Sequence, residues 1–548
     1  MPLQKNQVLT LRVERLSSDG SGVAHSPDGE TVFIPGAAPG DEARVRIVKD
    51  CKRYAFGILD EVLTPSPDRI PVDCAVAGPC GGCSLRHLDY AAELRAKQEN
   101  VADAFARIGG LDVPVLPIVG SPEVNRYRNK VQFPVGVDKS GKPCIGFYAG
   151  RTHRIVPCPD CRLQPGVLNE IGNTLCAFFA EKGIQPYSEE TGRGLVRHIF
   201  LRRGAHSGQI MVCLVCTRAR LPSAEELCTR LKAQFAEITT ILLNVNAKNT
   251  NVILGTETHT LYGPGYIEDT LCGVPVQLGP LSFYQVNTLA AEQLYGIAAQ
   301  YAQLTPDDLL LDLYCGMGTI GLSMAAHCRE LIGVEIVPEA IESAKANAVR
   351  MGADVAAKSR FFCADAGQAA TRLAAEGLHP DIVMLDPPRK GCDEATLSAV
   401  VRMAPRRVVY VSCNPATAAR DAAWEQNGYH AEKVQPVDLF PRTRHCECVI
   451  ALSKGEIDSK KVRVEFSLEG MDTSGLQKGA TYPEIKARVL EQTGLKVSSL
   501  YISQVKQKCG LEVRKNHHKA KSENTKQPHC PPEKEAAILD VLKYFKMI

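Results

Sequence analysis

The sequence predicts a multidomain protein in which an OB-like β-barrel, a central α+β region and a Rossmann-like α/β domain precede a small basic α+β tail. Three observations support this prediction. The chain has 548 residues, which is more than one hydrophobic core normally accommodates. Short β-type segments with turn residues fill the N-terminal part, and strands alternate with helices from about residue 281. The predicted ranges are 1–64, 70–280, 281–453 and 454–548.

The composition is that of a folded protein of the cytoplasm. Hydrophobic residues make up 45% and charged residues 23% of the chain, as in soluble globular proteins. No apolar run approaches the roughly 18–20 residues of a membrane helix, and the first ten residues do not resemble a secretory signal. The 21 cysteines are therefore expected to be buried thiols, metal ligands or nucleophiles rather than disulfides. We expect a cytoplasmic monomer without membrane contact.

Residues 1–64 have the pattern of five brief strands separated by Gly, Asp and Pro. This pattern is typical of a small barrel of the OB type. Basic and aromatic residues gather in its second half: Arg44, Arg46, Lys49, Lys52, Arg53, Tyr54 and Phe56. The combination suits a groove for a charged polymer whose units stack, and it is equally compatible with the solvated face of an ordinary barrel.

A cysteine cluster follows the barrel. Cys74, Cys80 and Cys83 form a C-x5-C-x2-C pattern, with two glycines inside that let the backbone wrap closely around a bound group. Three thiolates need a fourth ligand, which Cys158 or Cys161 could supply. Four Cys thiolates fit either a [4Fe-4S] cluster or a structural zinc ion.

The remainder of the central region is expected to contain one long helix and many strands. Residues 91–109 have helical spacing, and RYRNK begins a β-rich stretch that runs to about 280. RYRNK places Arg126, Arg128 and Lys130 on one face of a predicted strand. A phosphate backbone could lie along that face, although a solvated edge strand would have the same pattern.

From about residue 281 the pattern is that of a doubly wound α/β domain. LLLDLYCGMGTIGLSMA is an apolar strand that ends in Asp312, followed by a Gly-rich turn and a helix. Later strands end near Glu335, at Asp386 and at Ser412. In this fold class ligands bind at the carboxyl ends of the strands.

The glycine turn is compatible with two kinds of cofactor. Gly316, Gly318 and Gly321 spell G-x-G-x-x-G, and Glu335 follows about 20 residues later, where an acid hydrogen-bonds ribose hydroxyls. A nicotinamide or flavin dinucleotide and S-adenosylmethionine both fit. The loop LDPPRKG at Asp386, in which neither proline has a backbone N–H, favours adenosylmethionine, although a purely structural loop stays open.

Cys413 follows the buried strand VVYVS directly, and Pro415 prevents the strand from continuing. The thiol is therefore aimed at the ligand, where a polar setting can keep it partly ionised as a nucleophile. A thiolate that adds to C6 of uracil makes C5 able to take a methyl group from a sulfonium, after which a base must remove the C5 proton. In TRHCECVIAL the period of two puts His445 and Glu447 on one face. Glu447 is the predicted base with His445 in reserve, although a hairpin strand with a polar outer face would look the same.

These motifs resemble those of the RNA uracil-5-methyltransferases, which make 5-methyluridine in ribosomal and transfer RNA. The matching segments are QVN from Gln285, DLYCGMGTIGL from Asp312, LDPPRKG, VSCNPATAARD from Ser412 and HCECV from His445. The resemblance covers about residues 1–452. It implies an RNA-binding TRAM domain at the N-terminus, a [4Fe-4S] cluster in the central region and a C-terminal methyltransferase domain.

Site residues follow from the resemblance position by position. Cys413 is expected to be the nucleophile and Glu447 the proton acceptor. The adenosylmethionine-binding positions are Gln285, Tyr314, Glu335 and Asp386. The implied cluster ligands are Cys74, Cys80, Cys83 and Cys161, with Cys158 as a competing fourth ligand. Because the cluster-bearing members resemble ribosomal RNA enzymes, 23S rRNA is the expected substrate.

The tail carries a surplus of positive charge. Residues 454–548 hold 18 Lys and Arg against 12 Asp and Glu, whereas the rest of the chain holds 46 against 49. The tail is predicted to contain a strand in KVRVEFSLEG, a helix in TYPEIKARVLEQTG, a strand or helix in LYISQVKQKCGL and a last amphipathic helix. An added RNA-binding module and a domain that only packs on the core fit equally well.

Three other functions remain compatible with the sequence. Uridine methylation in transfer RNA would use the same site. A non-catalytic RNA-binding or ribosome-assembly factor would keep the fold without the chemistry, which the intact pair Cys413 and Glu447 disfavours. An NAD-linked oxidoreductase would use the glycine turn and leave Cys413 structural.

Overall fold

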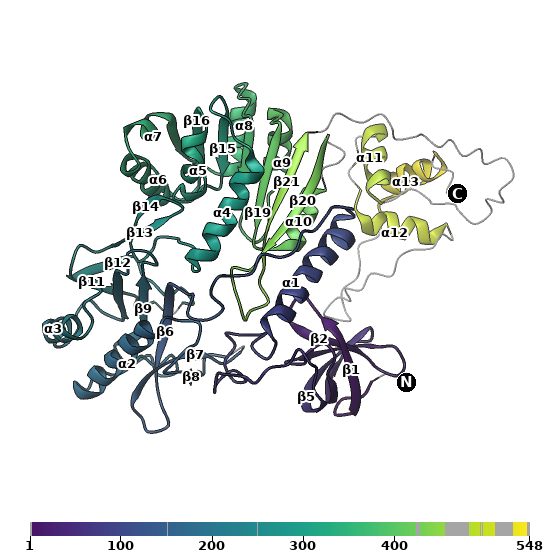
Figure 1. The fold of residues 1–548 in the computed structure, drawn as a ribbon. Coiled ribbons are helices and arrows are strands. Elements are labelled where there is room, and N and C mark those ends of the chain that lie inside the picture. The colour runs from purple at the N-terminus through teal and green to yellow at the C-terminus, as the bar shows by residue number, and fades with distance from the viewer. Residues whose placement is uncertain are drawn as a thin grey trace. The chain divides into compact units, whose positions relative to one another are not determined.

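The computed structural model describes residues 3–150, 152–248, 250–423, 428–454, 482–493, 495, 497–509 and 530–544. The chain divides into two compact units, Met1–Asp458 and Ser459–Ile548. Figure 1 shows the first unit as a β-barrel, a central sheet and a larger α/β part with helices on both faces of its sheet. None of the described helices is long and apolar enough to cross a membrane.

The N-terminal part is a closed five-stranded barrel with the strand order β1-β2-β3-β5-β4. Its strands are β1 (Val8–Leu16), β2 (Ser21–His25), β3 (Thr31–Pro35), β4 (Glu42–Asp50) and β5 (Tyr54–Thr64). Alternation along β4 places Ala43, Val45 and Ile47 in the barrel interior, where all three are fully buried. The predicted OB-like barrel is confirmed.

The basic groove predicted on the barrel is only partly present. Arg44 and Arg46 point outward and form ion pairs with acidic residues of β5 at 2.7 and 2.9 Å, as on a solvated face. Tyr54 packs edge-on against Phe33 and Phe56, with ring centroids 5.8 and 5.7 Å away, and it is 40% exposed. A surface on which a base could stack is therefore retained.

The central region is built on a seven-stranded sheet with the order β12-β11-β10-β9-β6-β7-β8, followed by the hairpin β13-β14. Its strands are β6 (Lys130–Val137), β7 (Pro143–Tyr148), β8 (Ile155–Pro157), β9 (Val196–Arg203), β10 (Ile210–Cys216), β11 (Ile238–Val245), β12 (Glu257–Tyr262), β13 (Ile267–Leu271) and β14 (Val274–Leu278). Its helices are α1 (Tyr90–Ala104) with the π-helical turn η1 (Phe105–Gly109), α2 (Gly166–Glu181) and α3 (Ala224–Gln234). Residues of α2 and α3 bury their apolar sides against this sheet, in agreement with the predicted β-rich stretch.

The strand face predicted for RYRNK is wrong. β6 begins only at Lys130, and Arg126 has a φ of 61°, which turns the backbone away from an extended path. The N–H groups of Arg126 and Arg128 donate to the carbonyls of Arg162 and Leu163 at 2.8 and 3.0 Å rather than to a neighbouring strand. The three basic residues therefore do not share one face of a strand.

The α/β part holds a second seven-stranded sheet, with the order β17-β16-β15-β18-β19-β21-β20. Its strands are β15 (Leu309–Leu313), β16 (Glu330–Glu335), β17 (Ser359–Cys363), β18 (Ile382–Leu385), β19 (Arg407–Ser412), β20 (Tyr429–Val437) and β21 (Glu447–Lys454). Its helices are α4 (Thr288–Ala302), α5 (Thr319–Met324) with the 3-10 turn η2 (Ala325–His327), α6 (Pro338–Arg350), α7 (Ala353–Lys358), α8 (Ala366–Ala375), α9 (Glu394–Met403) and α10 (Pro415–Ala422). One core packs α4 and α5 against the sheet and another packs α8, α9 and α10, so the predicted doubly wound domain is confirmed.

The strand order decides where a ligand can bind. The chain runs outward from β15 to β17 and then returns to β18 on the other side of β15, which leaves a crevice at the carboxyl ends of β15 and β18. β21 runs antiparallel between β19 and β20. Its first residue, Glu447, therefore lies at the same edge of the sheet as the end of β19.

The second unit contains three described helices: α11 (Tyr482–Thr493), α12 (Ser499–Lys508) and α13 (Pro532–Tyr544). Ile485, Ile502, Ile538 and Val541 are buried among them. The segment for which strand and helix were both open is thus a helix, α12. The strand predicted in KVRVEFSLEG lies outside the described residues.

The central sheet supplies a stability test. Phe133 is fully buried on β6, whereas Val137 at the end of the same strand is 56% exposed. Phe133→Ala should lower the free energy of unfolding by about 3–5 kcal/mol, because it removes apolar contacts and leaves a cavity. Val137→Ala should change it by about 0.5 kcal/mol or less. Urea denaturation followed by circular dichroism measures both, and equal losses would contradict the assigned core.

Candidate active site

Cys413 is held between a strand and a helix at the edge of the sheet. It is half-buried and directly follows β19. The side chain of Asn414 caps α10 by accepting a hydrogen bond from the Ala416 N–H at 3.2 Å, and Pro415 is the first residue of that helix, where a missing N–H is tolerated. The amide of Asn414 also donates to the Arg389 carbonyl at 3.1 Å. The position of the thiol is therefore fixed by the start of α10 and by the loop that contains Arg389.

The proline loop after β18 is braced against α10. The Arg420 guanidinium donates to the Lys390 carbonyl at 3.0 Å, and the Cys392 N–H donates to Asp421 at 2.8 Å. Since prolines cannot donate backbone hydrogen bonds, these contacts from α10 hold the loop from outside. The bracing keeps Arg389, in the middle of this loop, next to Cys413.

Two carboxyl groups and one guanidinium surround the Cys413 thiol. Burial, together with the charges of Glu447 and Asp386, raises the pKa of Cys413 to about 11, while a hydrogen bond with Arg389 acts to lower it. Burial and the neighbouring Asp386 raise the pKa of Glu447 to about 8, again opposed by Arg389. Burial raises the pKa of Asp386 to about 7. Both carboxyl groups can therefore exchange a proton near neutral pH.

The glycine turn after β15 is braced by Glu335 at the end of β16. One carboxylate oxygen of Glu335 accepts from the Gly316 N–H at 3.1 Å, and the other accepts from the Ile336 and Val337 N–H groups at 2.8 and 3.0 Å. Gly316 and Gly318 have φ values of 55° and 80°, which favour glycine. The predicted turn and its predicted acid thus form one structural unit.

Asp312 in the crevice is influenced by two other carboxyl groups. Burial, together with the charges of Asp386 and Glu335, raises the pKa of Asp312 to about 8. One oxygen of Asp312 accepts from the Gly321 N–H at 3.0 Å; the other is buried without a hydrogen-bond partner in the described part of the chain. A cationic ligand would relieve this accumulation of negative charge, whereas the pyrophosphate of a dinucleotide would add to it.

The other two predicted cofactor residues come from separate places. Gln285 lies in the loop between β14 and α4, and its carbonyl accepts from the Asn129 amide at 2.7 Å. Tyr314 directly follows β15 with a φ of 67°, and its hydroxyl is 3.4 Å from that of Thr396. Phe283 in the same loop as Gln285 is 72% exposed. An apolar side chain is therefore available at the surface beside the predicted cofactor residue.

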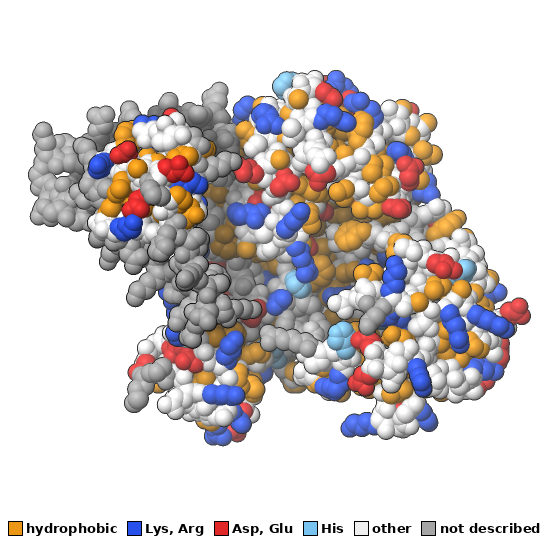
Figure 2. Space-filling view, turned by 180° about the vertical axis from the view of Figure 1, so that it is seen from behind, with side chains coloured by type: hydrophobic (Ala, Val, Ile, Leu, Met, Phe, Trp, Pro, Cys, Tyr) orange, Lys and Arg blue, Asp and Glu red, His pale blue; other side chains and the backbone are white. Residues whose placement is uncertain are grey.

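A cleft of about 650 Å³ opens onto Cys413. Its walls come from the β1–β2 turn of the barrel, from one side of α1 and η1, and from the loops that carry Cys413 and His445. Two aspartates line it together with five basic residues: Arg15, Lys97, Arg107, Arg389 and Arg444. On the face drawn in Figure 2, acidic and basic side chains are interspersed. The four arginines are exposed and suit a polyanion that reaches the thiol, whereas Lys97 is buried.

The cysteines of the central region surround a second cavity, of about 140 Å³. Five cysteines line it: Cys74, Cys80, Cys83, Cys158 and Cys161. In their present positions no three Cys, His, Asp or Glu side chains of the described residues are arranged to hold a single metal ion. The structure therefore brings all predicted ligands together around one cavity but does not arrange them as a mononuclear site.

Positive charge adjoins these thiols. Arg86, Arg128 and Arg162 line the same cavity. Two nitrogens of the buried Arg86 and one of Arg128 lack hydrogen-bond partners among the described residues. A hydrogen bond from the Cys158 thiol is the main cause that lowers the pKa of Cys161 to about 6. The cavity thus favours an anionic occupant with thiolate ligands.

Comparison with known proteins identifies the family. A model of the tRNA (uracil-5-)-methyltransferase family matches residues 277–455, and a TRAM domain model matches residues 2–59. An uncharacterized RNA methyltransferase of Halalkalibacterium halodurans is 43% identical over 453 residues, which is 82% of this chain and 98% of that protein. The chain belongs to the tRNA (uracil-5-)-methyltransferase family. A relative in Clostridium tetani, also named an uncharacterized RNA methyltransferase, is 40% identical over 83% of this chain and 98% of its own.

A solved structure supports the same assignment. The tRNA (uracil-54, C5)-methyltransferase of Pyrococcus abyssi, in complex with S-adenosyl-L-homocysteine, matches with a TM-score of 0.65 and 26% identity over 81% of this chain and 100% of that one. The 548-residue chain is therefore an adenosylmethionine-dependent RNA methyltransferase with an N-terminal TRAM domain, as the resemblance implied. The family assignment sets the nicotinamide-linked alternative aside.

Sequence reasoning missed two of the basic residues beside the thiol. Arg389 is in the quoted segment LDPPRKG, and its place two residues after a strand-end Asp-Pro pair could have indicated that it faces the site. Lys97 is in the middle of a helix about 300 residues before Cys413, and no spacing rule relates the two. Only the folded chain brings Lys97 to the cleft.

The charges around Cys413 predict opposite effects of two substitutions. Arg389→Gln removes the group that lowers the pKa of Cys413, so alkylation of this thiol by iodoacetamide should shift to higher pH. Glu447→Gln removes a negative charge that raises this pKa, so the profile should shift to lower pH. Peptide mass spectrometry across a pH series measures the rate at Cys413, with the exposed Cys363 as internal control. Shifts in the same direction would contradict the proposed arrangement.

Proposed function

We propose that this methyltransferase transfers the methyl group of S-adenosylmethionine to C5 of a uridine in 23S rRNA, through a covalent bond between Cys413 and C6 of the base. The observation that carries the proposal is the position of Cys413. It is a half-buried thiol at a strand end, hydrogen-bonded to Arg389 and flanked by Asp386 and Glu447. A nucleophile, a cation and a proton acceptor are thereby available around one reacting uracil.

The proposed reaction begins with the thiolate. Arg389 stabilises the Cys413 thiolate, whose sulfur forms a bond to C6 and makes C5 nucleophilic. C5 then forms a bond to the methyl carbon as the bond from that carbon to sulfur breaks, which leaves S-adenosylhomocysteine. Glu447 accepts the C5 proton; the electron pair of the C5–H bond forms the C5–C6 double bond and expels the Cys413 thiolate. With its pKa raised to about 8, Glu447 is basic enough for this step.

The carboxyl groups of the crevice support adenosylmethionine as the methyl donor. Glu335 lies at the ribose position expected in this fold class, and its bonds to the glycine turn hold the backbone for close approach of the ligand. Asp386 and Asp312 supply negative charge where the sulfonium and amino groups would be. Gln285 and Tyr314 complete the proposed set from the two flanking loops.

The cavity supports a [4Fe-4S] cluster better than zinc. Each iron of such a cluster takes its own thiolate, so the ligands surround the cube instead of converging on one ion. Four of the five lining cysteines, Cys74, Cys80, Cys83 and Cys161, would bind it, and the unpartnered nitrogens of Arg86 and Arg128 would face its negative charge. When bound, the group joins the segment around Cys80 to the turn after β8; no step of methyl transfer depends on it here.

Ribosomal RNA is the proposed substrate, and transfer RNA is the second candidate. The cysteine cluster and the TRAM barrel support the former through the family resemblance. The Pyrococcus abyssi structure, which is named for a transfer RNA uracil, supports the latter because it covers 81% of this chain. The basic cleft lined by Arg15, Arg107 and Arg444 would take either RNA.

Trapping with 5-fluorouridine tests the substrate and the mechanism together. Fluorine at C5 cannot leave as a proton, so the enzyme with adenosylmethionine should form a denaturation-resistant complex with 23S rRNA fragments that carry the analogue. Cys413→Ala should form none. Transfer RNA transcripts with the same label form the second arm. A complex that forms only with transfer RNA would identify transfer RNA, and not 23S rRNA, as the substrate. No complex with either RNA despite cofactor binding would contradict the covalent mechanism.

Spectroscopy of anaerobically purified protein tests the cluster. The wild type should contain iron and acid-labile sulfide and absorb visible light, and Cys161→Ser should lose both. Cys158→Ser serves as the matched control and should keep the cluster, because Cys158 is not a proposed ligand. Stoichiometric zinc without sulfide would contradict the cluster. Loss of the cluster only in Cys158→Ser would show that Cys158, and not Cys161, is the fourth ligand.

A further inference from the structure

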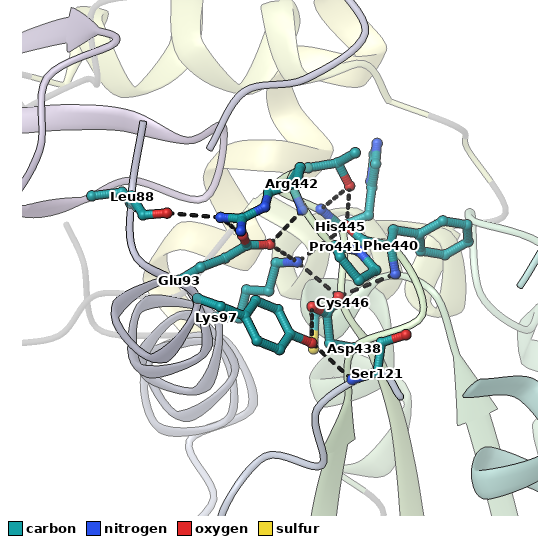
Figure 3. Close-up of polar contacts among 12 residues, drawn as sticks. Leu88, Glu93, Lys97, Ser121, Asp438, Phe440, Pro441, Arg442, His445 and Cys446 are labelled. Atoms are coloured by element: carbon teal, nitrogen blue, oxygen red, sulfur yellow. Dashed lines mark hydrogen bonds and ion pairs between the residues drawn. The ribbon is translucent and has the colours of Figure 1, made fainter. Parts of the chain in front are cut away.

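A buried network of charged side chains joins α1 to the loop of residues 438–446 (Figure 3). Its four members are Glu93 and Lys97 of α1 and Asp438 and Arg442 of the loop. All four are at most 9% exposed. The two carboxylates and two cations balance in charge, so none of them is left uncompensated in the interior.

Lys97 is the centre of the network. Its Nζ donates to Glu93 and to Asp438, each at 2.7 Å, and to the Phe440 carbonyl at 3.2 Å. All three donors of the ammonium are therefore used, and two of them hold the loop. Glu93 in turn accepts from the Arg442 N–H at 2.7 Å, which attaches a second point of the loop to α1.

Contacts from other segments surround the same loop. The Tyr127 hydroxyl donates to the Pro441 carbonyl and the Asn287 amide donates to the Leu439 carbonyl, both at 3.0 Å. Arg442 has a φ of 68°, a left-handed conformation that is strained for a residue with a side chain. Such a conformation persists only where surrounding contacts over-determine it. The network around Lys97 supplies these contacts together with Tyr127 and Asn287.

The loop connects the network to the reacting groups. It joins Val437 at the end of β20 to Glu447 at the start of β21, and these two residues are paired across the sheet. Arg444 and His445 of the loop line the cleft beside Cys413, and Lys97 lines it from α1. A shift of this loop would therefore move both the wall of the cleft and the first residue of β21.

We propose that Lys97 is a positioning residue. It fixes the loop of residues 438–446, which directly precedes the base Glu447, and thereby places Glu447 at the reacting uracil. This inference rests on the proposed function, because it assigns Lys97 to the proton-removal step of that reaction. The sheet holds Glu447 from one side through Val437. The network holds it from the other side, through the loop that ends at Cys446. Without Lys97, Glu93 and Asp438 would repel each other, and the loop would lose the two bonds that Lys97 donates to Asp438 and to the Phe440 carbonyl.

The test uses the full chain and RNA with ordinary uridine. Lys97→Met should still form the covalent RNA adduct and transfer the methyl group, but should remove the C5 proton slowly. A complex that survives a denaturing gel should then accumulate, and kcat should fall on the order of tenfold to a hundredfold, with the KM for RNA changed by less than about threefold. Glu447→Gln is the reference for a stalled reaction and should accumulate the same complex.

Two further variants separate positioning from loss of stability. Arg406 directly precedes β19, at the edge of the sheet opposite to Cys413, and it forms an ion pair at 2.7 Å with Asp308, whose side chain is 8% exposed. Arg406→Met breaks this ion pair. It should lower the melting temperature without accumulation of the complex. In Glu93→Gln/Lys97→Met the charge of the network is balanced again while the bonds from Lys97 to the loop stay absent, so the melting temperature should recover and the stall should persist.

The outcomes distinguish the inference from the function on which it rests. A stalled complex in Glu447→Gln but not in Lys97→Met would overturn the positioning role and leave the proposed reaction intact. Recovery of turnover in Glu93→Gln/Lys97→Met, or a raised KM with an unchanged kcat, would also overturn it. If Glu447→Gln itself accumulates no complex, the proposed base and with it the proposed function fail.

Discussion

The active-site region depends on the antiparallel insertion of β21 between β19 and β20. β21 pairs Cys448 with Ser412 on one side and Glu447 with Val437 on the other. Because β21 runs against β19, the start of one strand and the end of the other meet at the same edge. A shift of the register by one residue would send Glu447 to the opposite face of the sheet. The pairing of these three strands therefore determines which side chains can reach Cys413.

Burial gives this edge its chemistry. Asp312, Asp386 and Glu447 all have a raised pKa because they are desolvated, and neighbouring acids contribute to the rise at Asp312 and Glu447. Arg389 is the cation that opposes this effect at both Cys413 and Glu447. Burial and the neighbouring carboxyl groups raise the pKa of the Cys413 thiol, which disfavours the reactive thiolate. A cationic methyl donor beside the carboxyl groups would shift the balance toward the thiolate, so that binding of the donor would activate the proposed nucleophile.

Much of this arrangement could be predicted from the sequence because it follows from local patterns. The strand that ends before Cys413, the glycine turn with Glu335 and the five-stranded barrel each produce a signal within a few residues. The prediction for RYRNK was wrong because its basic residues alternate as they would on a strand, whereas the left-handed conformation of Arg126 interrupts the extended backbone. The cysteines of the cavity could be predicted from their spacing. Its arginines could not, because Arg86 and Arg162, which follow Cys83 and Cys161 closely, have no pattern of their own and Arg128 comes from another segment.

Lys97 marks the limit of such reasoning. As an i,i+4 partner of Glu93 it would be expected in solvent on a helix surface, yet it is fully buried because the loop of residues 438–446 covers it. The same helix contacts the barrel through the ion pair of Asp103 with Arg15 at 2.8 Å, lines the cleft with one side and packs against α10 (Figure 1). The barrel, the cleft and the loop before Glu447 thus share one helix. RNA bound in this cleft as proposed would be positioned by the same helix that holds the loop before Glu447, so the buried ion network would link RNA binding to the placement of the proposed base.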